Sequence, residues 1–143
     1  MDNIFLTTLE KMANWASHQS MWPLACGLSC CAIEMMHTAA SRYDLDQFGC
    51  LFRASPQHAD LMIVSGTVTH KMAPLIKNLY DKMLSPKFVI AMGNCAISGG
   101  LYTEAPSVLN GISNIIPVDI EVYGCPPRPE DLVKAILELQ HRS

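Results

Sequence analysis

The chain has 143 residues, of which 50% are hydrophobic, and a formal net charge of −3, so it can bury one sizeable core and is short for two. Its ten lysines and arginines are scattered rather than gathered in one run, which argues against a nucleic-acid partner. No apolar run reaches the roughly 20 residues that span a bilayer, and the first thirty residues lack the pattern of a secretion signal, so we expect a soluble, unsecreted protein.

Residues 1–19 are predicted to form an N-terminal amphipathic helix. Apolar residues recur there at helical spacing: Ile4, Phe5, Leu9, Met12, Trp15 and Ala16. Such a face can cover the chain's own core, which is the commonest use, dock on a partner subunit or rest on a membrane surface. The absence of a basic polar face disfavours the membrane. Residues 20–143 are then expected to form a single α/β domain.

Strands and helices alternate over residues 20–143. Strand character is found at 21–25, 61–65, 88–92 and 118–123, and helical periodicity at 72–84 and 130–139. Residues 41–56 have no regular period and are predicted to form a surface loop. The alternation predicts an open parallel sheet with helices on both faces.

Four of the six cysteines follow predicted strands. Cys30 and Cys31 come after the first strand, Cys95 after the third, and Cys125 closes the fourth. Because ligands bind at the carboxyl ends of the strands in open parallel sheets, we expect the four thiols to converge there. The adjacent pair can reach one centre only if the backbone turns sharply between its two members. Four thiols placed in this way suggest an iron-sulfur cluster.

The surroundings of these cysteines suit a cluster. Nearby glycines allow main-chain amides to approach inorganic sulfides. The final helix is expected to begin near Arg128 and to aim its N-terminal amides at the anionic centre. Arg128 and Arg53 are candidates for the positive charge that a buried anionic cluster requires.

Two other readings of the cysteines stay open. A structural zinc site is disfavoured because the chain has no C-x-x-C knuckle. Buried free thiols are common, and this reading suits Cys26 and Cys50 best. Cys26 lies four residues before Cys30, so it remains a possible substitute for one member of the adjacent pair, whereas Cys50 is predicted to be inert.

Five motifs occur in order: Trp-Pro-Leu-Ala-Cys-Gly-Leu-Ser-Cys-Cys-Ala-Ile-Glu-Met-Met, Phe-Arg-Ala-Ser-Pro-Gln-His-Ala-Asp, Lys-Met-Ala-Pro, Met-Gly-Asn-Cys-Ala and Gly-Cys-Pro-Pro-Arg-Pro-Glu. Through these motifs the chain, from about Trp15 to its end, closely resembles the 20 kDa-type subunit of respiratory complex I, the NADH-quinone oxidoreductase. The resemblance implies a flavodoxin-like fold. It also implies that Cys30, Cys31, Cys95 and Cys125 bind one 4Fe-4S cluster, the last in the electron chain, which reduces a quinone.

The resemblance further implies a place in a complex. The chain would be a peripheral subunit on the cytoplasmic or equivalent face of an energy-transducing membrane, inactive alone. Its implied partners are a larger subunit related to the hydrogenase large subunit, which shares the quinone pocket, a ferredoxin-like iron-sulfur subunit and the membrane subunits of a proton-translocating complex. A related complex with another electron donor, such as a reduced deazaflavin or ferredoxin, is the alternative. The adjacent pair Cys30 and Cys31 disfavours an energy-converting hydrogenase, because hydrogenase small subunits usually have C-x-x-C there.

The segment after the adjacent cysteines would face the quinone. Ala32, Ile33, Met35 and Met36 are therefore candidate lining residues, and Met suits a long apolar ligand because it is flexible and polarizable. A helix whose apolar face is simply core accounts for these four residues equally well.

Several polar residues invite a structural rather than a functional reading. Glu34 and Asp119 are carboxylates among apolar residues, and such groups more often form structural pairs than tune a protonation step. His37 is read as an exposed histidine at the end of a helix. The sequence departs from the family's usual pattern at Cys26, where a bulky residue is typical, and at Asn94, where alanine is common.

Overall fold

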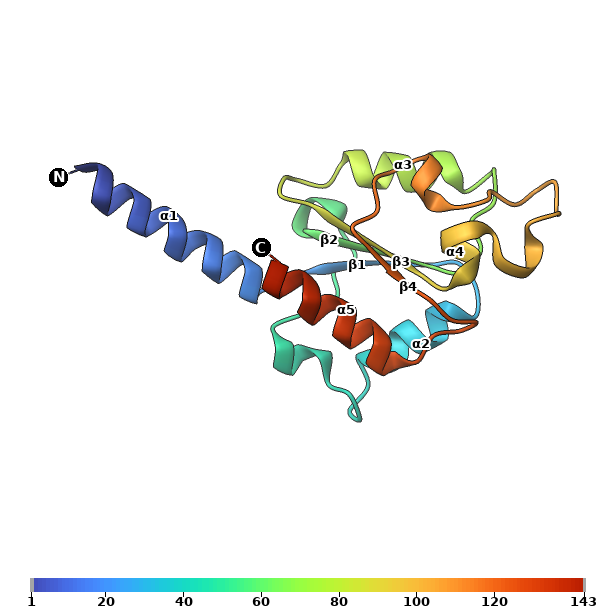
Figure 1. Cartoon of the computed structure of the whole chain (residues 1–143), viewed down its shortest axis with the longest axis horizontal. Coiled ribbons are helices and arrows are strands. Elements are labelled where there is room, and N and C mark those ends of the chain that lie inside the picture. The colour runs from blue at the N-terminus through green and yellow to red at the C-terminus, as the bar shows by residue number, and fades with distance from the viewer. Residues whose placement is uncertain (1, 143) are drawn as a thin grey trace.

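The computed structural model describes residues 2–142 and consists of a parallel sheet, helices on both of its faces and a projecting N-terminal helix (Figure 1). The elements in chain order are α1 (Asp2–Gln19), β1 (Pro23–Gly27), α2 (Cys31–Thr38), β2 (Leu61–Ser65), α3 (Ala73–Asp81), β3 (Phe88–Met92), α4 (Asn94–Ser98), β4 (Ile120–Val122) and α5 (Pro129–Arg142). Short 3-10 turns occur at Leu45–Phe48, Pro56–His58, Gly100–Tyr102 and Ile112–Asn114. Helices α3 and α4 lie on one face of the sheet, and α2 and α5 lie on the other (Figure 1).

The four strands are parallel and lie in the order β1-β2-β3-β4. Beyond β1, Arg53 forms an isolated parallel bridge with Leu24, and its main-chain N–H donates a hydrogen bond of 2.8 Å to the Pro23 carbonyl. If this segment is counted as an outermost strand, the order becomes 2-1-3-4-5, which is that of the flavodoxin-like fold. The predicted open parallel sheet with helices on both faces is confirmed. After β1 the chain first passes Arg53 on one side of this strand and then forms β2 on its other side, so the order in which strands are added reverses at this point.

The inner strands match their predicted ranges, and the outer ones differ. The first strand runs over Pro23–Gly27 rather than 21–25, because the Trp22 N–H is already bound by the Asp60 carboxylate at 2.6 Å. The last strand shortens to Ile120–Val122. Asp119, just before it, holds β3 through its carboxylate, which accepts the Val89 N–H at 2.8 Å, and through its own N–H, which donates to the Val89 carbonyl at 2.9 Å. The structural reading of Asp119 therefore fits the structure.

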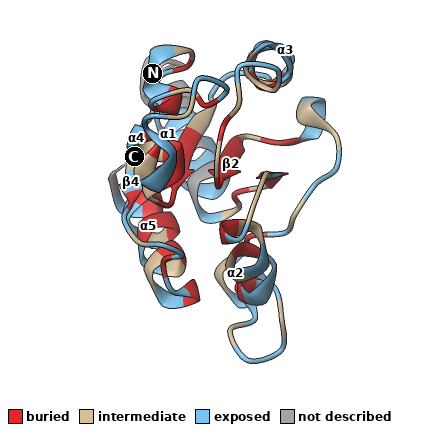
Figure 2. Ribbon diagram, turned by 90° about the vertical axis from the view of Figure 1, so that its right-hand side faces the viewer, coloured by how far each residue is buried: buried red, intermediate tan, exposed pale blue. Residues whose placement is uncertain are grey.

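Side chains of the sheet form two apolar layers. Leu61 and Ile63 of β2 point to the layer beneath α2 and α5, while Met62 and Val64 point to the layer beneath α3. Every residue of β2 is buried, which is typical of a parallel strand covered on both faces. Figure 2 shows this band of buried strands between exposed helix surfaces.

The segment 41–56 is more than the predicted surface loop. Leu45 and Cys50 are 1% and 0% exposed and belong to the core beneath α2 and α5. The side-chain amide of Gln140 in α5 donates to the Phe48 carbonyl at 3.0 Å, so the segment is fastened to the last helix. The prediction of a surface loop holds for most of the segment and is wrong at Leu45 and Cys50, because two inward side chains are too few to produce a period.

Helix α1 extends away from the sheet (Figure 1). Leu9, Met12 and Trp15 are 46%, 62% and 68% exposed, so for these residues the expectation that the helix covers the chain's own core is wrong. The side chains of Ile4 and Phe5 lie outside the described ones. Among the described residues, no helix combines the length and the apolar character needed to cross a bilayer.

Candidate metal centre

The four strand-end cysteines lie at the carboxyl edge of the sheet. Cys30 directly precedes α2 and Cys31 begins it, Cys95 is the second residue of α4, and Cys125 lies three residues beyond β4. Cys30, Cys95 and Cys125 border one cavity of about 270 Å³. The other residues lining this cavity are Ser29, Thr67, Leu101, Tyr102 and Val108. The strand-end placement therefore brings three distant thiols to one space.

Cys31 lies behind this cavity as the fourth thiol. Its side chain is 2% exposed. Burial raises the pKa of the Cys31 thiol to about 12, and the thiols of Cys30, Cys95 and Cys125 contribute in the same direction. Each of these three thiols is thus close enough to Cys31 to interact with it electrostatically. Ionising them together requires positive charge between them, which iron in a cluster supplies.

The backbone between the adjacent cysteines is an ordinary helix start. Cys30 has φ −55° and ψ −31°, and its carbonyl accepts the Ile33 N–H at 3.1 Å. The sharp turn expected between the two residues is therefore the first turn of α2, without the strain of a left-handed conformation. The helix directs the exposed Cys30 toward the cavity and the buried Cys31 toward the sheet.

Two glycines leave room for the sulfur atoms. Gly93 has φ +92°, and a Cβ added there would lie 2.5 Å from Cys31 Sγ. A Cβ added at Gly100 would lie 3.1 Å from Cys95 Sγ. A side chain at Gly93 would clash with the Cys31 sulfur, and one at Gly100 would press on the Cys95 sulfur, so glycine leaves space for the thiols at both positions. The predicted need for glycine beside the cysteines is met at these two positions.

Main-chain hydrogen bonds tie the strand ends together. Successive links run from Leu28 to Ser65, from Gly66 to Met92 and from Gly93 to Val122, at 2.9, 3.2 and 2.8 Å. Two side chains extend this network: Ser29 Oγ accepts the Thr67 N–H at 3.0 Å, and Asn94 Oδ1 accepts the Gly124 N–H at 3.0 Å. The network holds the cysteine loops in register. The sequence marks Asn94 only as a departure from the family's pattern and Ser29 only as a small residue beside the cysteines, and it gives no sign of their hydrogen-bond partners.

The two candidate arginines lie in different places. Arg128 directly precedes α5 and is three residues from Cys125, at the cysteine edge. Arg53 pairs with Leu24 near the amino end of β1, and its guanidinium stacks 3.9 Å from the centre of the Trp22 ring. It lines a separate cavity of about 430 Å³ with Trp22 and His58. The structure does not bring Arg53 to the cysteines, because the main-chain bridge holds it at the other end of the strand.

The four candidate quinone-lining residues diverge around α2. Ile33 and Met36 are 65% and 62% exposed, and Ala32 is partly buried. Met35 is 2% exposed, and its sulfur lies 3.6 Å from the Ser65 hydroxyl in the core. Ile33 and Met36 are therefore the members of this set that offer a surface to another molecule.

Cys26 and Cys50 lie apart from the four thiols. Cys26 packs in the layer beneath α3, on the opposite face of the sheet from Cys31. Cys50 is fully buried, 3.7 Å from the side-chain amide nitrogen of Gln140. Burial raises the pKa of each of these two thiols to about 11. Both fit the reading as neutral, buried thiols.

Glu34 and His37 form a local contact on α2. Glu34 Oε2 and His37 Nδ1 are 3.9 Å apart at i,i+3 spacing, and the His37 ring meets the Tyr43 ring edge-on at 5.3 Å. Both side chains are partly or largely exposed. The structural reading of these two residues fits this arrangement.

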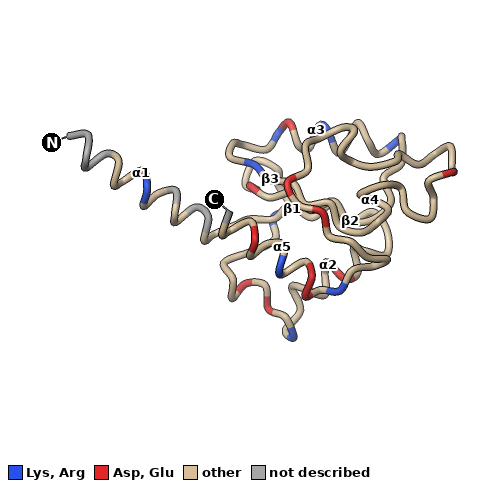
Figure 3. The backbone as a smooth tube through the Cα atoms, in the orientation of Figure 1, with Lys and Arg blue, Asp and Glu red and all other residues tan. Residues whose placement is uncertain are grey.

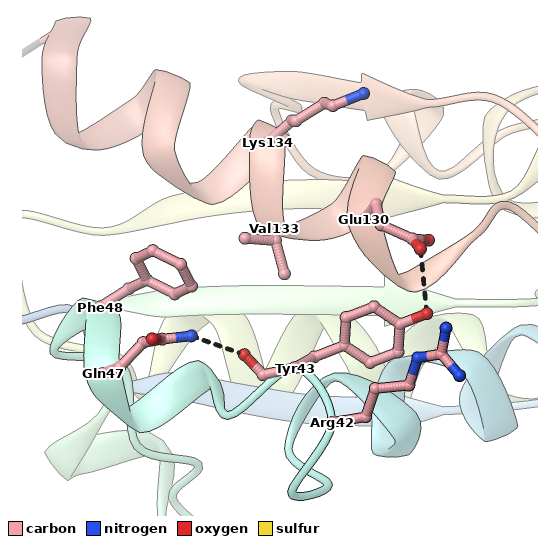
Figure 4. Close-up of a pocket in the computed structure, with 7 residues that line it drawn as sticks. All are labelled: Arg42, Tyr43, Gln47, Phe48, Glu130, Val133 and Lys134. Carbon is pink, nitrogen blue, oxygen red and sulfur yellow. Dashed lines mark hydrogen bonds between the residues drawn. The ribbon is translucent and has the colours of Figure 1, made fainter.

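A further cavity of about 340 Å³ separates the 42–48 segment from the first turns of α5 (Figure 4). It is lined by Arg42, Tyr43, Gln47, Phe48, Glu130, Val133 and Lys134. The Tyr43 hydroxyl donates to the Glu130 carboxylate at 2.9 Å, which raises the pKa of Tyr43. The main-chain N–H of Glu130 and this hydroxyl lower the pKa of the carboxyl group. The contact fastens the start of α5, the helix that follows Cys125.

The described residues contain no group of three His, Cys, Asp or Glu side chains arranged to hold a single metal ion.

Lysines and arginines are dispersed over the described chain rather than gathered on one face (Figure 3).

Comparison with known proteins identifies the family. The family described as NADH ubiquinone oxidoreductase, 20 Kd subunit, matches residues 29–139, a range that contains all four strand-end cysteines. The chain belongs to this family. The predicted resemblance to the complex I subunit is thereby confirmed at the level of the family. Members of the 20 Kd subunit family typically bind an iron-sulfur cluster.

Two solved structures are similar to this member of the 20 Kd subunit family. A chain of the membrane-bound sulfane sulfur reductase, an archaeal respiratory membrane complex, is 38% identical with a TM-score of 0.86, over 91% of this chain and 73% of that one. A chain of an NAD⁺-reducing NiFe-hydrogenase in the H₂-reduced state is 18% identical with a TM-score of 0.66, over 86% of this chain and 92% of that one. The second similarity shows the shared fold.

The residues present fit the iron-sulfur cluster of the 20 Kd subunit family. Cys30, Cys95 and Cys125 border one cavity, and the buried Cys31 lies near all three. Glycine provides the space beside two of the sulfurs. Thiolates are the usual protein ligands of such clusters.

Proposed function

We propose that this chain is the iron-sulfur electron-transfer subunit of a membrane-bound respiratory complex related to complex I and to hydrogenases. Cys30, Cys31, Cys95 and Cys125 hold one 4Fe-4S cluster. The observation that carries the proposal is the grouping of these thiols at the carboxyl edge of the sheet, three bordering one cavity and the fourth buried behind it. The cluster, when bound, takes up and passes on single electrons.

The chain supplies ligands and surroundings for this chemistry. The glycine backbone passes close to the sulfurs of Cys31 and Cys95, and the burial of Cys31 excludes water from that side of the site. Arg128 and the first amides of α5 offset the negative charge of the thiolates. These features stabilise a buried anionic group, which is otherwise expensive to desolvate.

The reaction of the whole complex is proposed from its relatives. The archaeal relative that is 38% identical belongs to a sulfane sulfur reductase, which favours a respiratory membrane complex of that kind over an NADH-quinone oxidoreductase. The family match supports the NADH-quinone reaction as the second candidate. In both cases the primary electron donor is bound by other subunits, and this chain alone is inactive.

Two surfaces are proposed for partner contacts. Ile33 and Met36, exposed on α2 directly after the adjacent cysteines, face the electron acceptor or the larger subunit that covers it. The exposed apolar face of α1 docks on another subunit of the complex. The chain is then a peripheral subunit held at the membrane by its partners.

Anaerobic purification of the complex from its native source tests the proposal. We expect iron and acid-labile sulfide in equal amounts, about four of each per copy of this chain after the partners' clusters are subtracted. Stoichiometric zinc without iron in the separately purified chain would contradict it. Turnover with a sulfane-sulfur acceptor against turnover with NADH and a quinone then separates the two candidate reactions.

A further inference from the structure

Asn94 joins the loops that carry two of the cysteines. It directly precedes Cys95, and it makes two hydrogen bonds to Gly124, which directly precedes Cys125. The Asn94 N–H donates to the Gly124 carbonyl at 3.0 Å, and Asn94 Oδ1 accepts the Gly124 N–H at 3.0 Å. The side chain thus completes a reciprocal pair where β3 and β4 have already ended.

The main chain on either side of the Asn94–Gly124 pair is also held in place. Gly93 donates its N–H to the Val122 carbonyl at 2.8 Å, which fixes the chain before Asn94. Gly124 lies so close to Pro127 that a Cβ added at Gly124 would be 2.6 Å from the Pro127 nitrogen. Gly124 therefore has little room to move away from Asn94. The position of Cys125 relative to Cys95 depends on the pair.

We propose that Asn94 is a positioning residue that, through this pair of hydrogen bonds, sets the arrangement of Cys95 and Cys125 and thereby the reduction potential of the cluster. This inference rests on the proposed function. The potential depends on the charges and dipoles close to the cluster, because positive ones stabilise its more negative, reduced state.

Two substitutions at Asn94 separate the contributions of hydrogen bonding and charge. Asn94→Ala keeps the main-chain bond to the Gly124 carbonyl but removes the acceptor of the Gly124 N–H. The partial negative charge of the Asn94 oxygen beside the Cys125 loop is then gone, and the positive end of the Gly124 N–H is no longer offset, which raises the potential. Asn94→Asp keeps an acceptor at the same place but adds a negative charge near the cluster, which lowers the potential.

The test is an anaerobic redox titration of the full chain, followed by electron paramagnetic resonance of the reduced cluster. We expect Asn94→Ala and Asn94→Asp to shift the midpoint potential in opposite directions, each by about tenfold in the equilibrium constant of reduction, which is about 59 mV for one electron. Asn78→Ala is the matched control, because Asn78 is exposed on α3, on the other side of the sheet from α2 and α5. It should keep the wild-type potential and spectrum.

Unchanged potentials and spectra in both Asn94 variants would overturn the inference. If Asn94→Ala does not retain iron, full iron content in Asn94→Asp supports it, because aspartate restores the acceptor. Loss of iron from both variants would overturn it.

A wild-type chain that holds no cluster would contradict the proposed function, and the positioning role is then measured without iron. Amide hydrogen exchange at Gly124 should be several-fold faster in Asn94→Ala than in the wild type. Equal exchange rates in the two chains would overturn the inference.

Discussion

At the scale of single residues, the contact of Gly93 with Cys31 sets a strict limit on substitution. A methyl group at Gly93 would lie 2.5 Å from Cys31 Sγ, at a φ of +92° that L-residues rarely adopt. We therefore expect Gly93→Ala to lose most of its iron and to lower the free energy of unfolding by about 1–3 kcal/mol. Iron analysis and urea unfolding measure these two effects.

The matched control is Gly49→Ala. Gly49 also has a positive φ, +75°, and its added Cβ would meet the Gln19 carbonyl rather than a cysteine. It should be destabilised to a similar degree while its folded fraction keeps the wild-type iron content. Full iron in Gly93→Ala would show that the space beside Cys31 does not matter for the cluster.

The buried thiols of Cys26 and Cys50 predict a dependence of stability on alkaline pH. Each has a pKa of about 11 in the folded chain, above the unfolded value of about 8.5. The folded state therefore holds these protons more tightly. Their contribution is complete below pH 8.5 and is lost between about pH 8.5 and 11, at up to about 1.4 kcal/mol per pH unit for each thiol.

Urea unfolding of the cluster-free chain across this range checks the prediction. Cys50→Ala should flatten the slope, because one buried thiol no longer titrates. A slope that is the same in Cys50→Ala and in the wild type would contradict the assignment of Cys50 as a thiol that is neutral in the folded state.

The sequence was sufficient to predict which cysteines lie together but not how they are held. The thiols were predictable because they follow strands whose carboxyl ends share one edge. Ser29 and Asn94 were not, because their partners, Thr67 and Gly124, are 38 and 30 residues away and meet them only through loop geometry. Arg53 was a candidate for the positive charge beside the cysteines. Its main-chain bridge to Leu24, which could not be predicted from the sequence, holds it near the amino end of β1 instead.

At the scale of elements, Asp119 fastens the last strand to its neighbour. Its carboxylate accepts the N–H of Val89, a residue with no exposed surface. Asp119→Ala would leave that donor without its partner, so we expect the free energy of unfolding to fall by about 1–3 kcal/mol. Asp119→Asn retains an acceptor oxygen and should lie closer to the wild type. Urea unfolding that ranks the two variants the other way would contradict this role.

Helix α1 is predicted to contribute to assembly rather than to the stability of the chain. Trp15 is 68% exposed, so Trp15→Ser should change the free energy of unfolding of the isolated chain by no more than about 0.5 kcal/mol. The same variant should recover less of the partner subunits when the complex is purified. A large loss of stability in the isolated chain, with normal assembly, would show that the helix packs on its own core.

The strands were easier to predict than the segments between them. Strands β2 and β3 lie between two apolar layers, so their apolar runs match their observed bounds. The ends of β1 and β4 depend on Asp60 and Asp119, whose long-range hydrogen bonds leave no pattern in the sequence. The burial of Leu45 and Cys50 in segment 41–56 was not predicted, because two buried side chains are too few to give a regular pattern of apolar residues.

At the scale of the whole molecule, the reversal of the chain between β1 and β2 explains the position of the site. The helices after these strands cover opposite faces of the sheet, which leaves their carboxyl ends accessible at one edge. The cysteines that follow β1, β3 and β4 reach this edge from separate parts of the chain. The order of the strands predicts that a ligand binds at this edge of the sheet. Which ligand it binds depends on the residues that follow each strand.

The most direct test of the central claim is electron paramagnetic resonance of the reduced protein in six single Cys→Ala variants, each purified anaerobically. The account predicts that the wild-type cluster signal is lost or replaced when Cys30, Cys31, Cys95 or Cys125 is changed. The signal should persist when Cys26 or Cys50 is changed. An intact wild-type signal in any of the first four variants, or its loss in either of the last two, would contradict the proposed set of ligands.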